Sequence, residues 1–169
     1  IDFLNGDMPH FFTSDLSLVD GASLLRPPED GVPLLNADQL EVVDWAVANV
    51  DIGREFGDAR PGMVSVHSWL EARLRVGSDV VVYYDHGTGE MADFVGIEQQ
   101  DRRLTIRLYH CKGAGGAAAG HRLGDLYEVT SQAVKSVTWA LKQRVLKHIR
   151  RRFTEETGAH QFIKGDLDA

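Results

Sequence analysis

Residues 80–112 decide the fold: Val80-Val-Val-Tyr-Tyr-Asp-His-Gly-Thr-Gly-Glu-Met-Ala-Asp-Phe-Val95, followed by Leu104-Thr-Ile-Arg-Leu-Tyr-His-Cys-Lys112. Runs of β-branched and aromatic residues between short polar turns predict three strands, over about 80–85, 90–99 and 103–112. Connections this short favour an antiparallel meander. Asp93 interrupts the apolar second strand, and His110 and Lys112 end the third on one face, because alternate residues point the same way. We therefore expect the chemistry of the protein here.

Helices are predicted on both sides of these strands. One begins at Asn36 as its N-cap, with an apolar stripe at helical spacing, Leu40, Val43, Val47 and Val50. A second covers residues 65–76, with Ser65 or Ser68 as its cap and Gly77 after its end, and a long third covers residues 125–152. Gln161–Lys164 is expected to add a last strand. The order helix–strand–strand–strand–helix–strand predicts an α/β protein with a mixed sheet flanked by helices.

The length of 169 residues suffices for one domain with a proper core and an appended segment. We assign residues 1–60 to an N-terminal extension, or the tail of a preceding region, and residues 61–169 to the core domain. Because the chain starts at Ile1, we expect it to be a piece of a larger protein. No apolar run approaches the roughly 20 residues of a membrane helix. The single cysteine, Cys111, excludes an intrachain disulfide and predicts a cytoplasmic location.

Charge is distributed unevenly along the chain. The net charge of −7 argues against a general nucleic-acid binder. Local fields nevertheless steer partners more than the net total does. Basic residues gather in one stretch, namely Lys135, Lys142, Arg144, Lys147, Arg150, Arg151 and Arg152. This stretch is predicted either to contact a nucleic-acid backbone or to form a solvated helix face.

Asp93, followed 17 positions later by His110-x-Lys112, resembles the signature of the PD-(D/E)xK nuclease superfamily. That superfamily has an αβββαβ restriction-endonuclease-like core and includes restriction endonucleases, Holliday-junction resolvases and nuclease domains fused to helicases. Glu71 before the strands and Gln132 after them match an acid and a Gln that resolvase-like members often carry. The resemblance covers about residues 65–150, and His110 replaces the usual acid of the third-strand motif.

A closer likeness runs through residues 85–93, 108–112 and 125–136, and it is to domains at the ends of bacterial helicase-like proteins. It implies a larger chain, with a helicase as a partner. The superfamily resemblance implies metal-dependent hydrolysis of phosphodiesters, with DNA as the expected nucleic acid.

The resemblance also implies a role for each matching residue. Asp93 would bind Mg2+ or Mn2+ together with the backbone carbonyl of His110 or Cys111, since hard cations prefer oxygen ligands. Lys112 would orient the attacking water or stabilise developing charge. Glu71 would bind a second metal or a metal-held water, and Gln132 would hold a phosphate or Lys112.

His110 leaves three interpretations open, because an imidazole suits Mn2+ or Zn2+ better than Mg2+. The domain is a Mn2+-favouring nuclease, a nuclease that draws the missing charge from Glu71, or a degenerate fold that serves as a nucleic-acid-binding or protein-interaction module. Glu71 has a simpler alternative as an exposed helix acid that pairs with Arg75 at i+4. Cys111 is expected to pack in the core as a small hydrophobe.

The remaining histidines and the Gly-rich segment match no established metal-binding or phosphate-binding motif. His67, His86 and His121 lack the spacing of a two-His zinc motif, so no structural zinc site is expected. Residues 113–120 lack the Gly-Lys-Ser/Thr ending of a P-loop, and we interpret them as a flap over a nucleic-acid strand or as a plain linker.

Overall fold

The computed structural model describes residues 10–13, 17–20, 22–26, 37–116, 118–139, 142–154 and 161–166. The chain divides into two compact units, Ile1–Val43 and Asp44–Ala169. The first unit contains an antiparallel sheet with the order β1-β2-β3. Its strands are β1 (His10–Phe12), β2 (Leu18–Asp20) and β3 (Ser23–Leu25), and the short 3-10 helix η1 (Ala37–Gln39) follows them.

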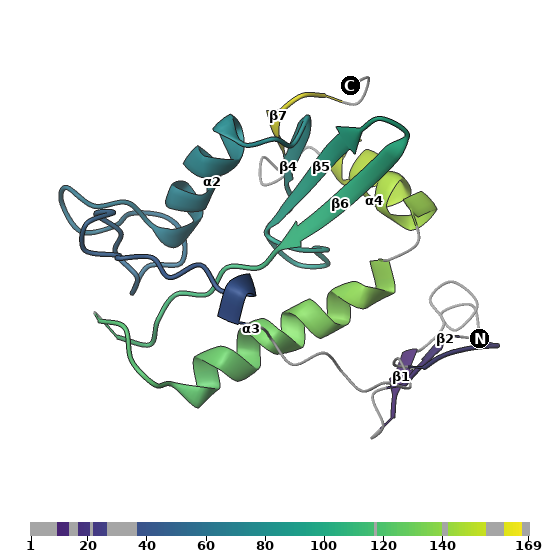
Figure 1. The fold of residues 1–169 in the computed structure, drawn as a ribbon, viewed down its shortest axis with the longest axis horizontal. Coiled ribbons are helices and arrows are strands. Elements are labelled where there is room, and N and C mark those ends of the chain that lie inside the picture. The colour runs from purple at the N-terminus through teal and green to yellow at the C-terminus, as the bar shows by residue number, and fades with distance from the viewer. Residues whose placement is uncertain are drawn as a thin grey trace. The chain divides into compact units, whose positions relative to one another are not determined.

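The second unit is built around a four-stranded sheet with the order β6-β5-β4-β7 (Figure 1). Its strands are β4 (Val81–Tyr84), β5 (Phe94–Gln100), β6 (Arg103–Tyr109) and β7 (Gln161–Lys164). The three predicted central strands and the predicted last strand are confirmed, with bounds shifted by a few residues. Over its described residues, the protein is therefore mixed α/β with two sheets.

The predicted mixed sheet is wrong for the described strands, because all pairs are antiparallel, including β4 with β7. Gln161 pairs with Tyr84, Tyr84 with Phe94, and Phe94 with Tyr109, so β7 begins at the end of the sheet where β6 finishes. The connection from β6 to β7 thus returns the chain to the end it left. One unbroken helix would carry the chain to the other end and give a parallel strand.

The prediction of a single helix over residues 125–152, within that connection, is also wrong, because the helix is broken. The structure has α3 (Leu123–Ser136), the 3-10 turn η2 (Val137–Trp139) and α4 (Lys142–Thr154). At the break, the Ser136 hydroxyl lies 2.8 Å from the carbonyl of Met91 and 3.1 Å from that of Gln132, one of which accepts its proton, and Thr138 donates to the carbonyl of Lys135. Hydroxyl side chains that bond to nearby carbonyls offer the backbone an alternative to the continued helix.

The helix predicted to begin at Asn36 is also wrong beyond η1, and Asn36 itself lies outside the described residues. The chain instead makes a turn over residues 45–49, in which the Asp44 carboxylate accepts from the amides of Ala46 and Val47. The stripe residues Leu40 and Val47 are exposed. A helical apolar pattern is stable only when a surface covers it, and these side chains have none within the described chain.

The helix α2 (Val66–Val76) forms as predicted. The Ser65 side chain caps it by accepting the amide of Ser68, and Gly77 follows its last turn. Among the described residues, no helix has both the length and the apolar character that crossing a bilayer requires.

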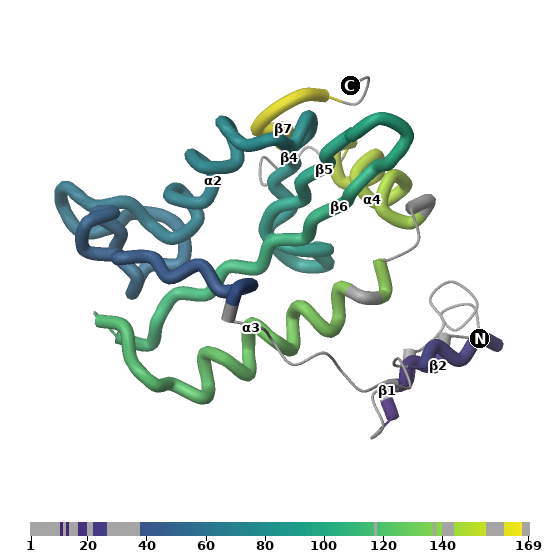
Figure 2. Tube along the Cα trace, viewed as in Figure 1, coloured from purple at the N-terminus to yellow at the C-terminus, as the bar shows by residue number. Residues whose placement is uncertain are grey.

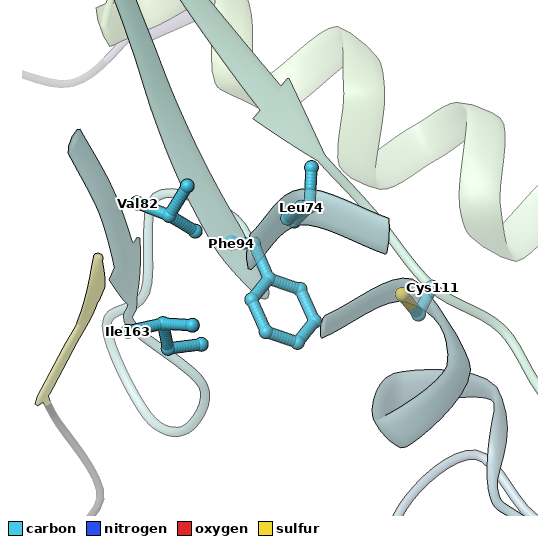
Figure 3. Close-up of a cluster of buried hydrophobic side chains, with 5 residues drawn as sticks. All are labelled: Leu74, Val82, Phe94, Cys111 and Ile163. Atoms are coloured by element: carbon cyan, nitrogen blue, oxygen red, sulfur yellow. The ribbon is translucent and has the colours of Figure 1, made fainter. Parts of the chain in front are cut away.

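The core of the second unit lies on both faces of its sheet, as the alternation of β4 requires. One cluster joins α2 to the sheet and consists of Leu74, Val82, Phe94, Cys111 and Ile163 (Figure 3). The other joins α4 to the opposite face and consists of Tyr83, Met91, Val95, Val145 and Ile149. The predicted core position of Cys111 is confirmed, since only 4% of the residue is exposed.

Residues 44–60 are tied to this core. Val50 forms a parallel bridge with Val64, and the amide of Ala114 donates to the carbonyl of Ile52, at 2.7 Å. This last bond fixes the start of the long connection that the trace in Figure 2 makes between β6 and α3. The segment that precedes α2 thus belongs to the same unit as the predicted site.

Candidate metal centre around Asp93

Asp93 lies directly before β5, where the ladder with β6 ends. The last pair of that ladder is Phe94 with Tyr109, and beyond it the amide of Cys111 donates to Asp93 Oδ2, at 2.8 Å. The carboxylate therefore takes the place of a backbone partner for the chain leaving β6. The residue is 1% exposed, so its charge is removed from bulk water.

Two imidazoles from different elements meet the other carboxylate oxygen. His86, in the connection between β4 and β5, places Nδ1 2.8 Å from Asp93 Oδ1. His67, on α2, places Nε2 3.3 Å from the same oxygen, and the two ring centroids are 5.0 Å apart. Glu90 Oε2 lies 3.4 Å from His86 Nδ1. Sequence reasoning missed both histidines, because a helix and a strand separate them and no local spacing signals their meeting.

The side chains fit a divalent cation. The ligand atoms of His67, Asp93 and Cys111 all lie within 4.8 Å of one another, and so do those of His86, Glu90 and Asp93. His67 Nε2 is buried and makes no hydrogen bond within the described part of the chain.

Tyr84 occupies the other nitrogen of His67, with its hydroxyl 3.3 Å from Nδ1. A histidine that binds a metal through one nitrogen commonly has the other fixed by such a partner. A buried nitrogen without a hydrogen bond also costs free energy unless something occupies it. Both observations match a nitrogen that is able to coordinate a cation beside an anionic oxygen.

The electrostatics of the cluster keep Asp93 ionised. Burial acts to raise the pKa of Asp93, but contacts with His67, the Cys111 amide and His86 together outweigh burial and lower this pKa. Burial and the charge of Asp93 raise the pKa of the Cys111 thiol. The same two causes raise the pKa of Tyr84 to about 12. Asp93 thus supplies the anionic ligand, and Cys111 becomes one only when a cation displaces its proton, which leaves to water.

His110, a predicted site residue, contacts Ser136 through its side chain, and Gln132, another, reaches Ser136 only through its backbone carbonyl. His110 Nε2 is 2.6 Å from Ser136 Oγ, whose single proton goes to the Met91 or the Gln132 carbonyl. His110 Nε2 is therefore the donor, and burial lowers the pKa of His110, which favours the neutral ring. Within the described chain, His110 Nδ1 and Gln132 Oε1 are buried acceptors without hydrogen-bond partners.

Lys112 and Glu71 are each held by opposite charges. Lys112 Nζ lies 2.6 Å from Glu128 and 3.3 Å from Glu55. Glu71 lies 2.6 Å from Arg75, which confirms the simpler alternative for that residue. The ion partners of these two side chains are thus other residues than Asp93, and their predicted roles in catalysis stay predictions.

Arg152 does not belong to the exposed basic surface that the sequence predicted. It belongs to the stretch predicted to contact nucleic acid, but it is 6% exposed and its Nε lies 2.9 Å from Asp85 Oδ1. Asp85 is fully buried and also accepts from His148 Nε2, at 2.9 Å. A buried carboxylate requires such partners, so Arg152 serves the packing of α4 rather than a phosphate.

The rest of the basic stretch remains at the surface where the structure describes it. Arg144 is half-buried, and the side chain of Lys142 lies outside the described residues. The exposed members are Lys135, Lys147, Arg150 and Arg151. Arg152 Nη1 donates to the carbonyl of Thr88, at 2.7 Å, so the last turn of α4 contacts the connection that carries His86. Exposed cations of α4 thus lie on an element that adjoins the Asp93 cluster.

Comparisons of the chain with family models, with curated proteins and with solved structures found no match.

Proposed function

We propose that residues 44–169 form a metal-dependent nuclease domain that hydrolyses phosphodiester bonds in nucleic acid, with DNA as the expected substrate. The observation that carries the proposal is the buried, ionised Asp93 between His67 and His86, with His67 Nε2 left without a hydrogen bond in the described chain. Mixed nitrogen and oxygen ligands favour Mn2+ over Mg2+. The expected cofactor is therefore Mn2+, with Mg2+ as the weaker alternative.

Each residue of the cluster would have a separate role in the hydrolysis. A divalent cation bound here would activate water and neutralise charge on the phosphoryl oxygens. Asp93 would hold the cation with ligands from the two groups that share it, His67 and Cys111 in one and His86 and Glu90 in the other, and Tyr84 would keep His67 in the ligating orientation. Lys112 would reach a phosphate by exchanging its carboxylate partners, a small cost because partly exposed ion pairs contribute only about 0–1 kcal/mol.

Nucleic acid as the substrate is supported by charge and by resemblance. The buried Arg152 of α4 contacts the connection that carries His86, and the same helix carries exposed cations, whose field attracts a phosphate backbone. The order of α2, β4, β5 and β6 resembles the start of the αβββαβ core of the PD-(D/E)xK superfamily, but two helices, α3 and α4, precede β7, and all described strand pairs are antiparallel.

The test is cleavage of end-labelled single-stranded and duplex DNA in EDTA, in Mg2+ and in Mn2+. We expect cleavage in Mn2+ and none in EDTA. Asp93→Asn and His86→Gln should each lower the rate by about 100-fold or more, since even residues that only support metal ligands contribute 10–100-fold. Asp79→Asn is the matched control, because Asp79 is also buried but pairs with Arg107, outside the cluster. Undiminished cleavage by both Asp93→Asn and Lys112→Ala refutes the proposal.

A second candidate, a non-catalytic nucleic-acid-binding module, is favoured by one observation. Lys112 is held between Glu55 and Glu128 rather than by Asp93. This candidate predicts binding that weakens linearly with salt on logarithmic axes, with no turnover in any metal. Replacing Lys147, Arg150 and Arg151 with Glu should abolish that binding, and unchanged affinity would exclude α4 as the contact surface.

A further inference from the structure

A cavity of about 500 Å³ opens beside the Asp93 cluster. Its size is that of a small-molecule site. Cys111 contributes both to its wall and to the ligand atoms around Asp93, so cavity and cluster are neighbours. The side chains that matter for recognition are Trp45, Trp69, Leu126, Val129, Lys112 and Arg122.

Aromatic and aliphatic groups form much of the cavity wall. The indoles of Trp45 and Trp69 meet edge to face, with centroids 5.0 Å apart. Leu126 lines the cavity from α3 and is 56% exposed, so nothing in the described chain covers it. The Arg73 guanidinium lies 4.8 Å from the centroid of the Trp69 ring and covers one of its faces. The other indole surfaces beside an exposed aliphatic residue suit a planar ring, since nucleobases stack on aromatic side chains without regard to sequence.

Polar groups of the same wall set the chemistry of the occupant. Lys112 and Arg122 bring positive charges to the wall, and Asp125 brings a carboxylate, which accepts the Gly115 amide. Glu128 and Glu55 hold Lys112, so Lys112 would meet an anionic group only by exchanging these partners. His110 also lines the cavity, and its Nδ1 is a buried acceptor without a partner in the described residues. The occupant should therefore combine a planar ring, a hydrogen-bond donor and an anionic group.

We propose that this cavity binds one unpaired nucleobase of a nucleic-acid strand. The base lies against Trp45 and Trp69, an amino or ring N–H group of the base donates to His110 Nδ1, and the adjoining phosphate meets Lys112 and Arg122. The inference rests on the proposed function and deepens it, because it makes a strand with an unpaired base the substrate. A base within a duplex is paired and stacked, and it enters such a pocket only when it is flipped out.

The test measures binding by metal-free protein in EDTA, so that cleavage is not required. The probe is a single-stranded oligodeoxynucleotide of about ten nucleotides, within the usual site size, carrying one 2-aminopurine. We expect its emission to change on binding, and a fully paired duplex of the same sequence to bind at least about tenfold more weakly.

Leu126→Glu places a carboxylate in the cavity and should weaken binding at least about fivefold, the smaller end of what one stacked base contributes. Leu123→Glu is the matched control, because Leu123 lies on the same helix, is 71% exposed and does not line the cavity. Equal weakening by both variants, equal binding of the duplex, or an unchanged emission on binding each overturns the proposal.

An independent measurement covers the case in which Leu126→Glu does not fold. In a Trp139→Phe protein the remaining indoles are those of the cavity, since Trp139 packs against His148. Their emission should be quenched by the unlabelled strand, and no quenching refutes the pocket. Binding that survives in Asp93→Asn without cleavage separates the two proposals. Cleavage by the parent without any signal from base or indoles refutes the pocket alone.

Discussion

If the Asp93 cluster binds a metal ion, the ion should stabilise the folded protein, and the substitution His67→Gln tests this prediction. A cation that binds only the folded state adds about 2.7 kcal/mol when its concentration is 100 times its dissociation constant. For a domain of this size, each kcal/mol raises the melting temperature by about 3–6 °C. Mn2+ should thus raise the melting temperature of the parent by about 8–16 °C over the value in EDTA.

The same substitution also affects the metal-free protein. In EDTA it removes the bond between His67 Nδ1 and the Tyr84 hydroxyl, worth about 1 kcal/mol, together with the 3.3 Å contact between His67 Nε2 and Asp93 Oδ1. The shift with Mn2+, however, should disappear because a ligand is gone.

The matched control is His148→Gln, which alters the other buried histidine beside a buried aspartate. His148 Nε2 lies 2.9 Å from Asp85 Oδ2, and removing that bond to a charged acceptor should cost about 1.5–3 kcal/mol in EDTA. The shift with Mn2+ should nevertheless remain. Melting curves from circular dichroism, in EDTA and in Mn2+, decide the matter. A Mn2+ shift that survives in His67→Gln, or is absent from the parent, refutes the metal centre.

Two further predictions concern packing. Arg152→Met leaves the buried Asp85 without its guanidinium partner and should cost about 3–5 kcal/mol in urea unfolding. Burial acts to raise the pKa of Asp85, but the contacts with His148, the Met91 amide and Arg152 outweigh burial and lower this pKa. The free energy of unfolding that these contacts contribute is therefore fully present above the pKa of an unfolded Asp, about 3.9, and it is lost as the pH falls through the lower pKa of Asp85 in the folded protein. Arg152→Met should flatten that acid slope, and an unchanged slope would contradict the pairing. Gly96→Ala would set a methyl group 2.7 Å from the Asp79 carboxylate, so we expect a loss of about 1–3 kcal/mol, and no change in the urea midpoint would show that the carboxylate moves freely.

Local signals predicted the parts of the fold that depend on neighbouring residues. The cap at Ser65 and the glycine at position 77 predicted α2, and the runs of β-branched residues predicted β4, β5 and β6. The break between α3 and α4 was missed because Ser136 bonds to Met91, 45 residues away in the sequence. No pattern within a helix reveals a partner at that separation.

The sequence predicted only part of the candidate site, because contacts between distant residues complete it. Asp93 stands out in the sequence because a carboxylate between apolar pairs requires an explanation, and the structure surrounds it with His67, His86 and the Cys111 amide. The two histidines come from elements whose packing, not whose sequence, sets the distance between them. Strand alternation placed His110 on the face of Lys112, but the strand ends at Tyr109, before either residue.

The bond between the Cys111 amide and the Asp93 carboxylate ties the geometry of the cluster to the folding of the β5–β6 hairpin. A slip of one residue in that hairpin would turn every side chain to the other face and separate the two groups. Only chains that close the hairpin in the native register therefore assemble the cluster at all. The Cys111 amide proton should in consequence exchange with solvent as slowly as the strand interior while Asp93 is charged. Its exchange rate would then report the fraction of the population in which the hairpin is open and the cluster is unable to bind a cation.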